Sequence, residues 1–292
     1  MNDKIVISGF ADEIDPKLDE QLKVVTGLGM NHISLRAADG KGIADYTVEE
    51  AKESLLPRLQ AAGVKVSSLG SPIGKVGIED EEGFEKQLAQ LDTLCQICQV
   101  LDCRYIRMFS FFIPEGKNPD DYHDQVLEKL KKFAAVAEKY NVVLIHENEK
   151  EIYGDIGRRC KVVLDAVGSD HFKAAFDFAN FVQCGEDPAE CWEMLKDQVV
   201  YIHIKDAVYG KGENVVCGTG DGKIPELLEQ AICKDGYEGF LTLEPHLVMF
   251  DTFKSLETEE SAKTFTGNKA ANGAEGYAMQ YNALKAILDK FM

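Results

Sequence analysis

Four segments of the sequence each end in a residue type that binds metal ions well: VVLIHE at residues 142–147, FKAAFD at 172–177, VVYIH at 199–203 and GFLTLE at 239–244. In each segment a run of mostly β-branched or aromatic residues stops on one polar residue, in the order Glu147, Asp177, His203 and Glu244. The intervals of 30, 26 and 41 positions between these residues are each long enough for one helix and its loops. Strands that recur with helices between them build a parallel sheet.

The rest of the chain carries four more apolar runs of strand length, at residues 5–10, 32–36, 65–69 and 105–111. Stretches with helical spacing of apolar residues lie between the runs, and several open with helix-start signals: Asp15-Pro16, Asn118-Pro119, Asp187-Pro188 and a capping box from Thr47 to Glu50. Eight strands that alternate with helices predict an α/β fold, specifically a closed (β/α)₈ TIM barrel. Because no linker or low-complexity tract interrupts the pattern, we expect one domain over residues 1–292.

The four polar strand ends predict a metal site. Taken singly, each carboxylate has the simpler interpretation of a loop-capping residue, and His203 that of a buried core histidine. Taken together, they meet at one mouth of the barrel, where converging like charges need a cation. Three oxygen ligands and one imidazole favour a single divalent ion. Mn²⁺ is the leading expectation, and Mg²⁺, Co²⁺ and Zn²⁺ are the alternatives.

Composition narrows the classes of partner. The chain has 32 Lys and Arg against 50 Asp and Glu, a formal net charge of −18, which argues against a nucleic-acid partner. No apolar stretch has the length of a membrane span, and the N-terminus lacks the apolar core of a signal peptide. The eight cysteines are irregularly spaced, and the pair Cys95 and Cys98 lies in an apolar helical run, so we interpret them as buried thiols. A cytoplasmic protein without a membrane partner is expected.

The segments around the four strand ends resemble a known family. HENE at 146–149, FDFAN at 176–180, HIKD at 203–206 and LEPH at 243–246 are similar to the signature of xylose-isomerase-like TIM barrels, and GFADEI at 9–14 and GTGDG at 218–222 resemble the same group. More narrowly, the resemblance is to sugar phosphate isomerases and epimerases, which include ketose 3-epimerases, hydroxypyruvate isomerases and inosose dehydratases. It covers almost the whole chain. It implies a metal-dependent isomerase or epimerase of carbohydrate metabolism, with a small carbohydrate or polyol as substrate, and a homo-oligomer.

The resemblance also implies roles for single residues. Glu147 and Glu244 would bind the metal and act as the acid and base that move a proton beside the substrate carbonyl through an enediolate. Asp177 and His203 would be structural ligands. Asn180 stands where ketose 3-epimerases commonly carry a substrate-binding histidine, so it is a candidate substrate contact and a departure from that pattern. Strand alternation and position at the mouth add four further candidates for substrate binding: Glu13, Arg36, Lys205 and His246.

Several alternatives stay open. An inosose-type dehydratase would use the same metal and the same proton abstraction, and a carbohydrate-binding barrel without catalysis would keep the same site. A DNA-repair nuclease of the endonuclease IV type is disfavoured by six histidines and the acidic charge. Arg107 faces either the mouth or the helix layer, and Arg36 and Lys205 keep a phosphorylated substrate open. The polar segment 251–275 is either a lid beside the mouth or a solvated loop.

Overall fold

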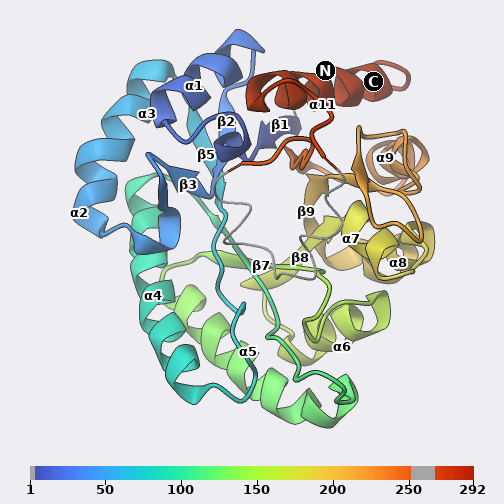
Figure 1. The fold of residues 1–292 in the computed structure, drawn as a ribbon. Coiled ribbons are helices and arrows are strands. Elements are labelled where there is room, and N and C mark those ends of the chain that lie inside the picture. Colours follow the sequence, from blue (N-terminus) through green and yellow to red (C-terminus); the bar gives the residue numbers. More distant parts are fainter. Residues whose placement is uncertain (1–3, 251–266) are drawn as a thin grey trace.

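The computed structural model describes residues 4–250 and 267–292, and it shows eight parallel strands that form a nearly closed barrel inside a ring of helices (Figure 1). Hydrogen bonds join the strands in the order β1-β12-β9-β8-β7-β6-β5-β2, and a bridge between Phe10 and Ser34 brings the last strand back to the first. The predicted single-domain TIM barrel is confirmed. The strands are β1 (Ile5–Gly9), β2 (His32–Leu35), β5 (Lys65–Leu69), β6 (Tyr105–Met108), β7 (Val143–Glu147), β8 (Phe172–Asp177), β9 (Val199–Ile204) and β12 (Gly239–Leu243).

The strand bounds follow the sequence prediction closely, with one exception. Seven strands begin and end within one residue of the predicted runs, whereas β6 ends at Met108 and not at residue 111. Phe111 adopts a left-handed backbone conformation with φ of 69°, which extended structure cannot accommodate, so the chain turns before it reaches this residue. Two short antiparallel hairpins lie outside the barrel sheet: β3 (Ala37–Ala38) with β4 (Lys41–Gly42), and β10 (Asp206–Ala207) with β11 (Asn214–Val215).

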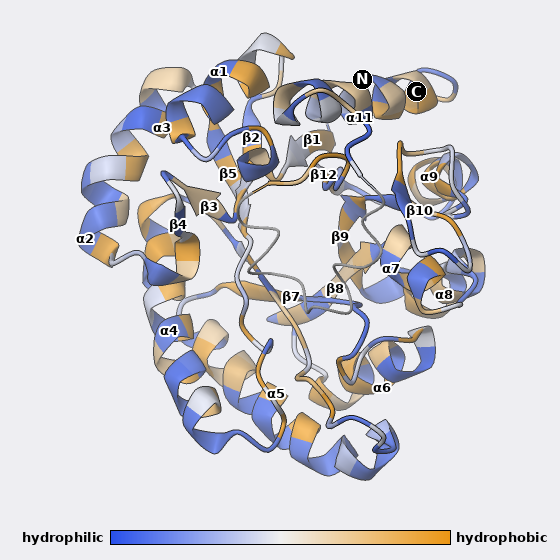
Figure 2. Ribbon diagram, in the orientation of Figure 1, coloured by the Kyte–Doolittle hydropathy of each residue, from blue (hydrophilic) through white to orange (hydrophobic). Residues whose placement is uncertain are grey.

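The helices mix hydrophilic and hydrophobic residues along their length, as expected for helices that bury one face against a sheet (Figure 2). They are α1 (Leu18–Gly27), α2 (Val48–Glu50), α3 (Leu56–Ala62), α4 (Glu81–Val100), α5 (His123–Lys139), α6 (Gly157–Val167), α7 (Phe178–Gln183), α8 (Pro188–Leu195), α9 (Ile224–Cys233) and α11 (Gly273–Leu288). Short 3₁₀ turns include η1 (Ala11–Glu13) and η4 (Pro119–Tyr122).

Most helix-start predictions hold. Thr47 and Glu50 form the predicted capping box, and the Asp187 carboxylate accepts a hydrogen bond from the backbone N–H of Ala189 at the start of α8. Asn118 caps η4, which leads into α5. The Asp15 prediction is wrong: Asp15 closes a local turn on the N–H of Lys17, so α1 begins only at Leu18.

The C-terminal segment is only partly as predicted. The predicted loop 251–275 includes residues 251–266, which lie outside the described residues, while α11 already begins at Gly273. The Asn272 side chain accepts the N–H of Glu275 and caps this helix. A Cβ atom at Gly273 would overlap the carbonyl oxygen of Glu13, so glycine allows α11 to lie directly against η1 at the mouth.

Inside the barrel, hydroxyl groups form the layer beneath the strand ends. The Tyr201 hydroxyl lies 2.8 Å from Ser67 Oγ and 2.9 Å from Ser68 Oγ, and it accepts a hydrogen bond from Thr242 Oγ1 at 2.7 Å. Ser8 Oγ extends the network to Ser67 at 2.6 Å. All of these side chains are buried, so the hydrogen bonds satisfy polar groups that would otherwise be costly to bury. Tyr201 precedes His203 by two positions on β9 and therefore supports the residue above it on the same face.

Six of the cysteines are buried thiols, as predicted, whereas Cys184 is half-buried and Cys233 is exposed. All eight are free, and Cys95 and Cys98 are fully buried within α4, where burial raises the pKa of the Cys95 thiol to about 12. Among the described residues, no helix combines the length and the apolar character that crossing a membrane requires.

Candidate metal centre

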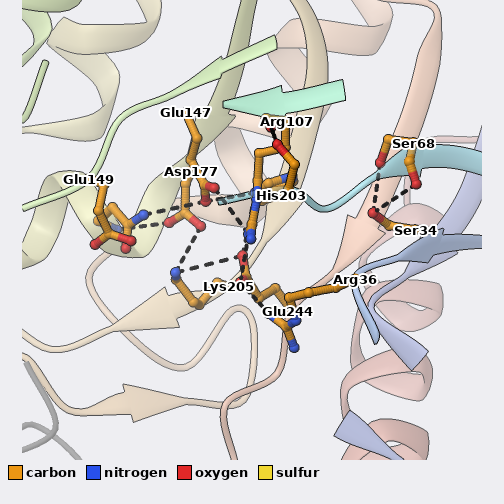
Figure 3. Close-up of polar contacts among 12 residues, drawn as sticks. Ser34, Arg36, Ser68, Arg107, Glu147, Glu149, Asp177, His203, Lys205 and Glu244 are labelled. Atoms are coloured by element: carbon orange, nitrogen blue, oxygen red, sulfur yellow. Dashed lines mark hydrogen bonds and ion pairs between the residues drawn. The ribbon is translucent and has the colours of Figure 1, made fainter. Parts of the chain in front are cut away.

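Four side chains with metal-binding groups meet at the carboxyl end of the barrel (Figure 3). Glu147 ends β7, Asp177 ends β8, His203 is the penultimate residue of β9, and Glu244 directly follows β12. One ligand atom from each residue lies within 4.8 Å of the ligand atoms of the other three. The parallel register causes this convergence, because His203 pairs with Asp177 on one side and with Thr242 on the other. The predicted convergence is therefore present.

The chemistry of the cluster fits a divalent metal ion. Each of the four residues is at most 2% exposed. Glu147 Oε2, Asp177 Oδ2 and Glu244 Oε2 make no hydrogen bond, although cationic side chains approach them. Burying three carboxylates together is costly unless positive charge compensates them. Three carboxylates and one imidazole are ligands that first-row divalent ions and Mg²⁺ accept, so these four residues could hold the metal.

Without a metal ion, protons and fixed cations compensate the cluster. Burial opposes a charge on His203, but Glu147 and Glu244 outweigh burial and raise the pKa of the imidazole to about 9. His203 Nδ1 lies 2.8 Å from Glu147 Oε1 and 3.4 Å from Glu244 Oε2. Burial raises the pKa of Asp177 to about 7 against the opposing field of Lys205. A bound metal ion would replace the protons on His203 and Asp177, because metal ligands bind in their deprotonated form.

Arg107 and Lys205 reach the carboxylates from neighbouring strands. Arg107 on β6 faces the mouth, which settles the question left open by the sequence, and its Nη1 lies 3.3 Å from Glu147 Oε2 and 3.5 Å from Glu244 Oε1. Lys205 Nζ lies 3.1 Å from Asp177 Oδ2 and 3.7 Å from Glu244 Oε2. Burial alone would raise the pKa of Glu244, but Lys205 and His203 hold it well below its usual range.

Arg36 joins the metal cluster to a second group of carboxylates. Its Nε donates to Asp12 Oδ2 at 2.9 Å, its Nη1 to Glu244 Oε1 at 3.1 Å and its Nη2 to Glu13 Oε1 at 3.2 Å. Glu13, Glu244 and His246 form another set whose ligand atoms lie within 4.8 Å of one another. Burial raises the pKa of Glu13 to about 8 despite the nearby Arg36. The guanidinium group thus already supplies a cation to this second set.

His246 and Asn180 contact different carboxylates of the site. The backbone N–H of His246 donates to Glu13 Oε2 at 2.7 Å, and its Nε2 lies 3.5 Å from both Glu13 Oε1 and Glu244 Oε1. The backbone N–H of Asn180 donates a hydrogen bond to Asp177 Oδ1 at 2.8 Å, and the side-chain Nδ2 of Asn180 lies 3.5 Å from Glu147 Oε1. Asn180 therefore contacts two of the candidate ligands directly and is placed to orient them.

Phe10 supports the cationic side of the cluster. Its ring centroid lies 4.5 Å from Arg36 Cζ, 4.8 Å from Arg107 Cζ and 5.2 Å from the His203 ring, which it meets at 79°. Phe10 is fully buried. Cations over an aromatic face are attracted by its quadrupole, so this single ring helps to hold both guanidinium groups beside Glu244.

The structure brings together every candidate residue named from the sequence, namely Glu13, Arg36, Glu147, Asp177, Asn180, His203, Lys205, Glu244 and His246. The sequence interpretation missed Asp12, Phe10 and Asn148, and the Asn148 side chain holds the Asp177 backbone through two hydrogen bonds of 3.0 Å. Phe10 and Asp12 both lie in the GFADEI segment, so their position after β1 was the available signal.

Comparisons with known proteins agree with this architecture. The family model described as the xylose isomerase-like TIM barrel matches residues 22–264. No curated protein sequence matches the chain. Similar solved structures include an IolI protein with a bound zinc atom, which is 14% identical, has a TM-score of 0.75 and aligns over 98% of this chain and 99% of that chain.

Two further solved structures are similar over nearly their whole length. The 3-keto-D-glucoside 4-epimerase YcjR from E. coli, in apo form, is 15% identical, with a TM-score of 0.71 and coverage of 98% of this chain and 99% of that chain. A xylose isomerase domain protein from Planctomyces limnophilus is 18% identical, with a TM-score of 0.71 and coverage of 99% and 97%. At these identities the likeness establishes the fold. Because the family model spans most of the sequence, this chain belongs to the xylose isomerase-like TIM-barrel family.

Proposed function

We propose that this protein is a metal-dependent isomerase or epimerase of a small sugar or polyol derivative. The observation that carries the proposal is the arrangement of Glu147 and Glu244, which approach His203 Nδ1 from strands β7 and β12, on either side of β8 and β9. Two carboxylates that reach one ligand centre from different strands suit removal of a proton at one position and its return at another. Epimerases are among the solved structures with this fold.

The residues of the site divide the work in the proposed reaction. Glu147, Asp177, His203 and Glu244 would hold the metal ion, with Mn²⁺ as the first ion to test. A divalent ion in this position supplies Lewis acidity that polarises the substrate carbonyl and the adjacent hydroxyl. One glutamate, in its ionised form, takes the proton from the carbon beside the carbonyl. The other must carry a proton when the substrate binds, and it returns that proton to the enediolate; exchange with solvent between turnovers restores both groups. Arg36, Arg107 and Lys205 keep Glu244 ionised through the contacts described above.

The proposal is tested by proton exchange with solvent. The Mn²⁺-loaded protein is incubated in deuterium oxide with a panel of ketoses and inososes, and products are followed by NMR and mass spectrometry. The expected result is incorporation of deuterium into the sugar without loss of water. Glu147→Gln and Glu244→Gln should each reduce the exchange rate by at least about a hundredfold, because each removes one acid/base group.

Glu128→Gln is the matched control, since Glu128 is an exposed residue on α5 that pairs with Lys132. It should exchange at the wild-type rate. Loss of water from an inosose would instead identify a dehydratase that works on the same site. Binding of the metal without exchange on any member of the panel would leave a non-catalytic carbohydrate-binding barrel and contradict the proposal.

A further inference from the structure

We propose that the substrate of this site carries no phosphate or other anionic group, so that the enzyme acts on an uncharged keto sugar or polyol. The inference rests on the proposed function for the reaction, and it adds the charge class of the substrate. Three features of the described residues support it: the pairing of the cations at the mouth, the filled glycine-rich loop, and the excess of hydrogen-bond acceptors around the cluster.

The cationic side chains that contact the cluster are already engaged. Arg36 donates from Nε, Nη1 and Nη2 to three different carboxylates. Arg107 and Lys205 each contact two carboxylates of the cluster. Nearer the rim, Lys75 Nζ lies 3.3 Å from Glu149 Oε2, and Lys150 Nζ donates to Gln183 Oε1 at 3.2 Å. A phosphoryl group would have to draw Arg36 away from Asp12 and Glu13, and Lys75 away from Glu149, and none of these three carboxyl groups belongs to the four candidate metal ligands.

The glycine-rich loop GTGDG at residues 218–222 has the composition of an anion cradle, yet an internal carboxylate fills it. Asp206 Oδ2 accepts the N–H groups of Gly218 and Gly220 at 2.8 and 2.9 Å. Asp206 Oδ1 accepts those of Gly222 and Ala207 at 2.9 and 3.0 Å. A Cβ atom at Gly220 would lie only 2.5 Å from Asp206 Oδ1, so the loop closes tightly around its own side chain. The N–H groups that could bind a phosphate are therefore occupied.

The buried carboxylates at the mouth favour a ligand that can donate hydrogen bonds. Beyond the four candidate metal ligands, the buried side chains at the mouth include the carboxylates Asp12 and Glu149. A sugar hydroxyl can donate to a carboxylate and also accept from a cation, whereas a phosphate dianion only accepts and is repelled by the same carboxylates. A ring of hydroxyl groups matches such a site, and a phosphorylated substrate does not.

Matched pairs of ligands test the charge class directly. D-Fructose and D-tagatose are compared with their 6-phosphates on the Mn²⁺-loaded protein, by deuterium exchange and by isothermal titration. The free ketoses should have kcat/KM for exchange at least about tenfold higher than their phosphates, and should bind more tightly. A higher kcat/KM or tighter binding for the phosphates would overturn the inference while leaving the isomerase proposal intact.

Inorganic phosphate gives a readout that does not depend on turnover. It is titrated into the metal-free protein, in which no bound ion can hold it, and binding should be undetectable below about 1 mM. A submillimolar dissociation constant would show an anion site and contradict the inference. Absence of deuterium exchange with every ketose and every phosphate would instead count against the isomerase proposal, so the two failures are distinguishable.

A charge variant tests why phosphate is excluded. Glu149→Gln removes the carboxylate that faces Lys75, and it should raise the affinity for D-tagatose 6-phosphate by about threefold or more relative to D-tagatose. Glu128→Gln makes the same chemical change beside Lys132 on the exposed face of α5 and should leave the ratio of the two affinities unchanged. Equal ratios in the two variants would contradict exclusion by paired carboxylates.

Discussion

At the scale of single residues, Glu244 is the point where most charges of the site meet. Its two oxygens contact Arg36, Arg107, Lys205 and His203 at distances between 3.1 and 3.7 Å. Glu147, by contrast, contacts His203 at 2.8 Å and Arg107 at 3.3 Å, and its next contact is the neutral side chain of Asn180 at 3.5 Å. The two glutamates therefore occupy unlike electrostatic surroundings although both end parallel strands. Unlike surroundings are what a pair of groups needs if one is to take a proton and the other to give it.

The pKa of His203 leads to a pH dependence of metal binding. The carboxylates raise the pKa of His203 to about 9, so below that pH a metal ion must displace a proton from the ring. The apparent Mn²⁺ affinity should therefore rise by up to about tenfold per pH unit between pH 7 and 8. Below pH 7 the rise should be steeper, up to about a hundredfold per unit, because Asp177 also holds a proton there. Titration calorimetry in buffers of different ionisation enthalpy measures the protons released. An affinity that stays constant over this range would contradict the prediction.

Phe10 should influence the reaction through the cations that it holds. Phe10→Leu keeps an apolar side chain but removes the ring beneath Arg36 and Arg107, so the carboxylate of Glu244 loses part of its positioning. We expect the unfolding free energy to fall by about 1–3 kcal/mol and kcat for deuterium exchange to fall about tenfold, with little change in KM. Denaturant unfolding and exchange kinetics provide the two measurements.

The control for this variant is Phe133→Leu, since Phe133 is equally buried in α5, where its ring stacks on Phe111 at 5.7 Å. It should lose comparable stability while kcat stays close to the wild-type value. If both variants lowered kcat equally, the effect of Phe10 would be one of general stability and the positioning role would be wrong.

At the scale of elements, strand ends were predictable and loop conformations were not. The four candidate ligands could be located because carboxyl ends of parallel strands share one edge and because alternation sets their facing. The direction of the Arg107 side chain could not be predicted, because it depends on the register of the strand in the barrel, which the sequence of one strand does not reveal. Asp12 lies in a 3₁₀ turn, so no periodic pattern indicated it. His246 was named from strand alternation, but it lies beyond the end of β12 and has a φ of 47°, so its conformation was not predictable. The contact of Arg36 with Glu244 joins positions 208 residues apart and leaves no local signal.

Asp206 shows how one side chain can organise a loop. With β9 ended at Ile204, Asp206 turns into the glycine-rich loop and accepts four backbone N–H groups. Asp206→Asn places an amide NH₂ against some of these donors, so we expect the unfolding free energy to fall by about 2–4 kcal/mol. Urea unfolding measures the change. Asp170→Asn, at an exposed pair with Lys173, is the control and should leave the unfolding free energy close to the wild-type value. A cost as small as that of the control would show that the loop does not depend on the carboxylate.

At the scale of the whole molecule, the barrel concentrates buried charge at one end. The opposite interior is filled by the apolar cluster Val143, Ile145, Ala175 and Tyr201 and by the hydroxyl network around Tyr201, both of which are satisfied without any ligand. The mouth contains carboxylates whose oxygens lack hydrogen bonds. A cation bound at the mouth should therefore add to the stability of the fold, whereas the opposite interior needs no ligand.

Metal binding should accordingly stabilise the entire fold. An ion present at a hundred times its dissociation constant adds about 2.7 kcal/mol, which for a chain of this size corresponds to a rise in Tm of about 5 °C. Differential scanning calorimetry with Mn²⁺ and with a chelator measures the shift. Asp177→Asn retains an oxygen that can cap α7 but removes one charge from the cluster, so it should lose most of the rise, whereas Asp170→Asn should keep it. A shift of equal size in Asp177→Asn would place the bound ion elsewhere, because only a site that includes this carboxylate loses affinity when its charge is removed.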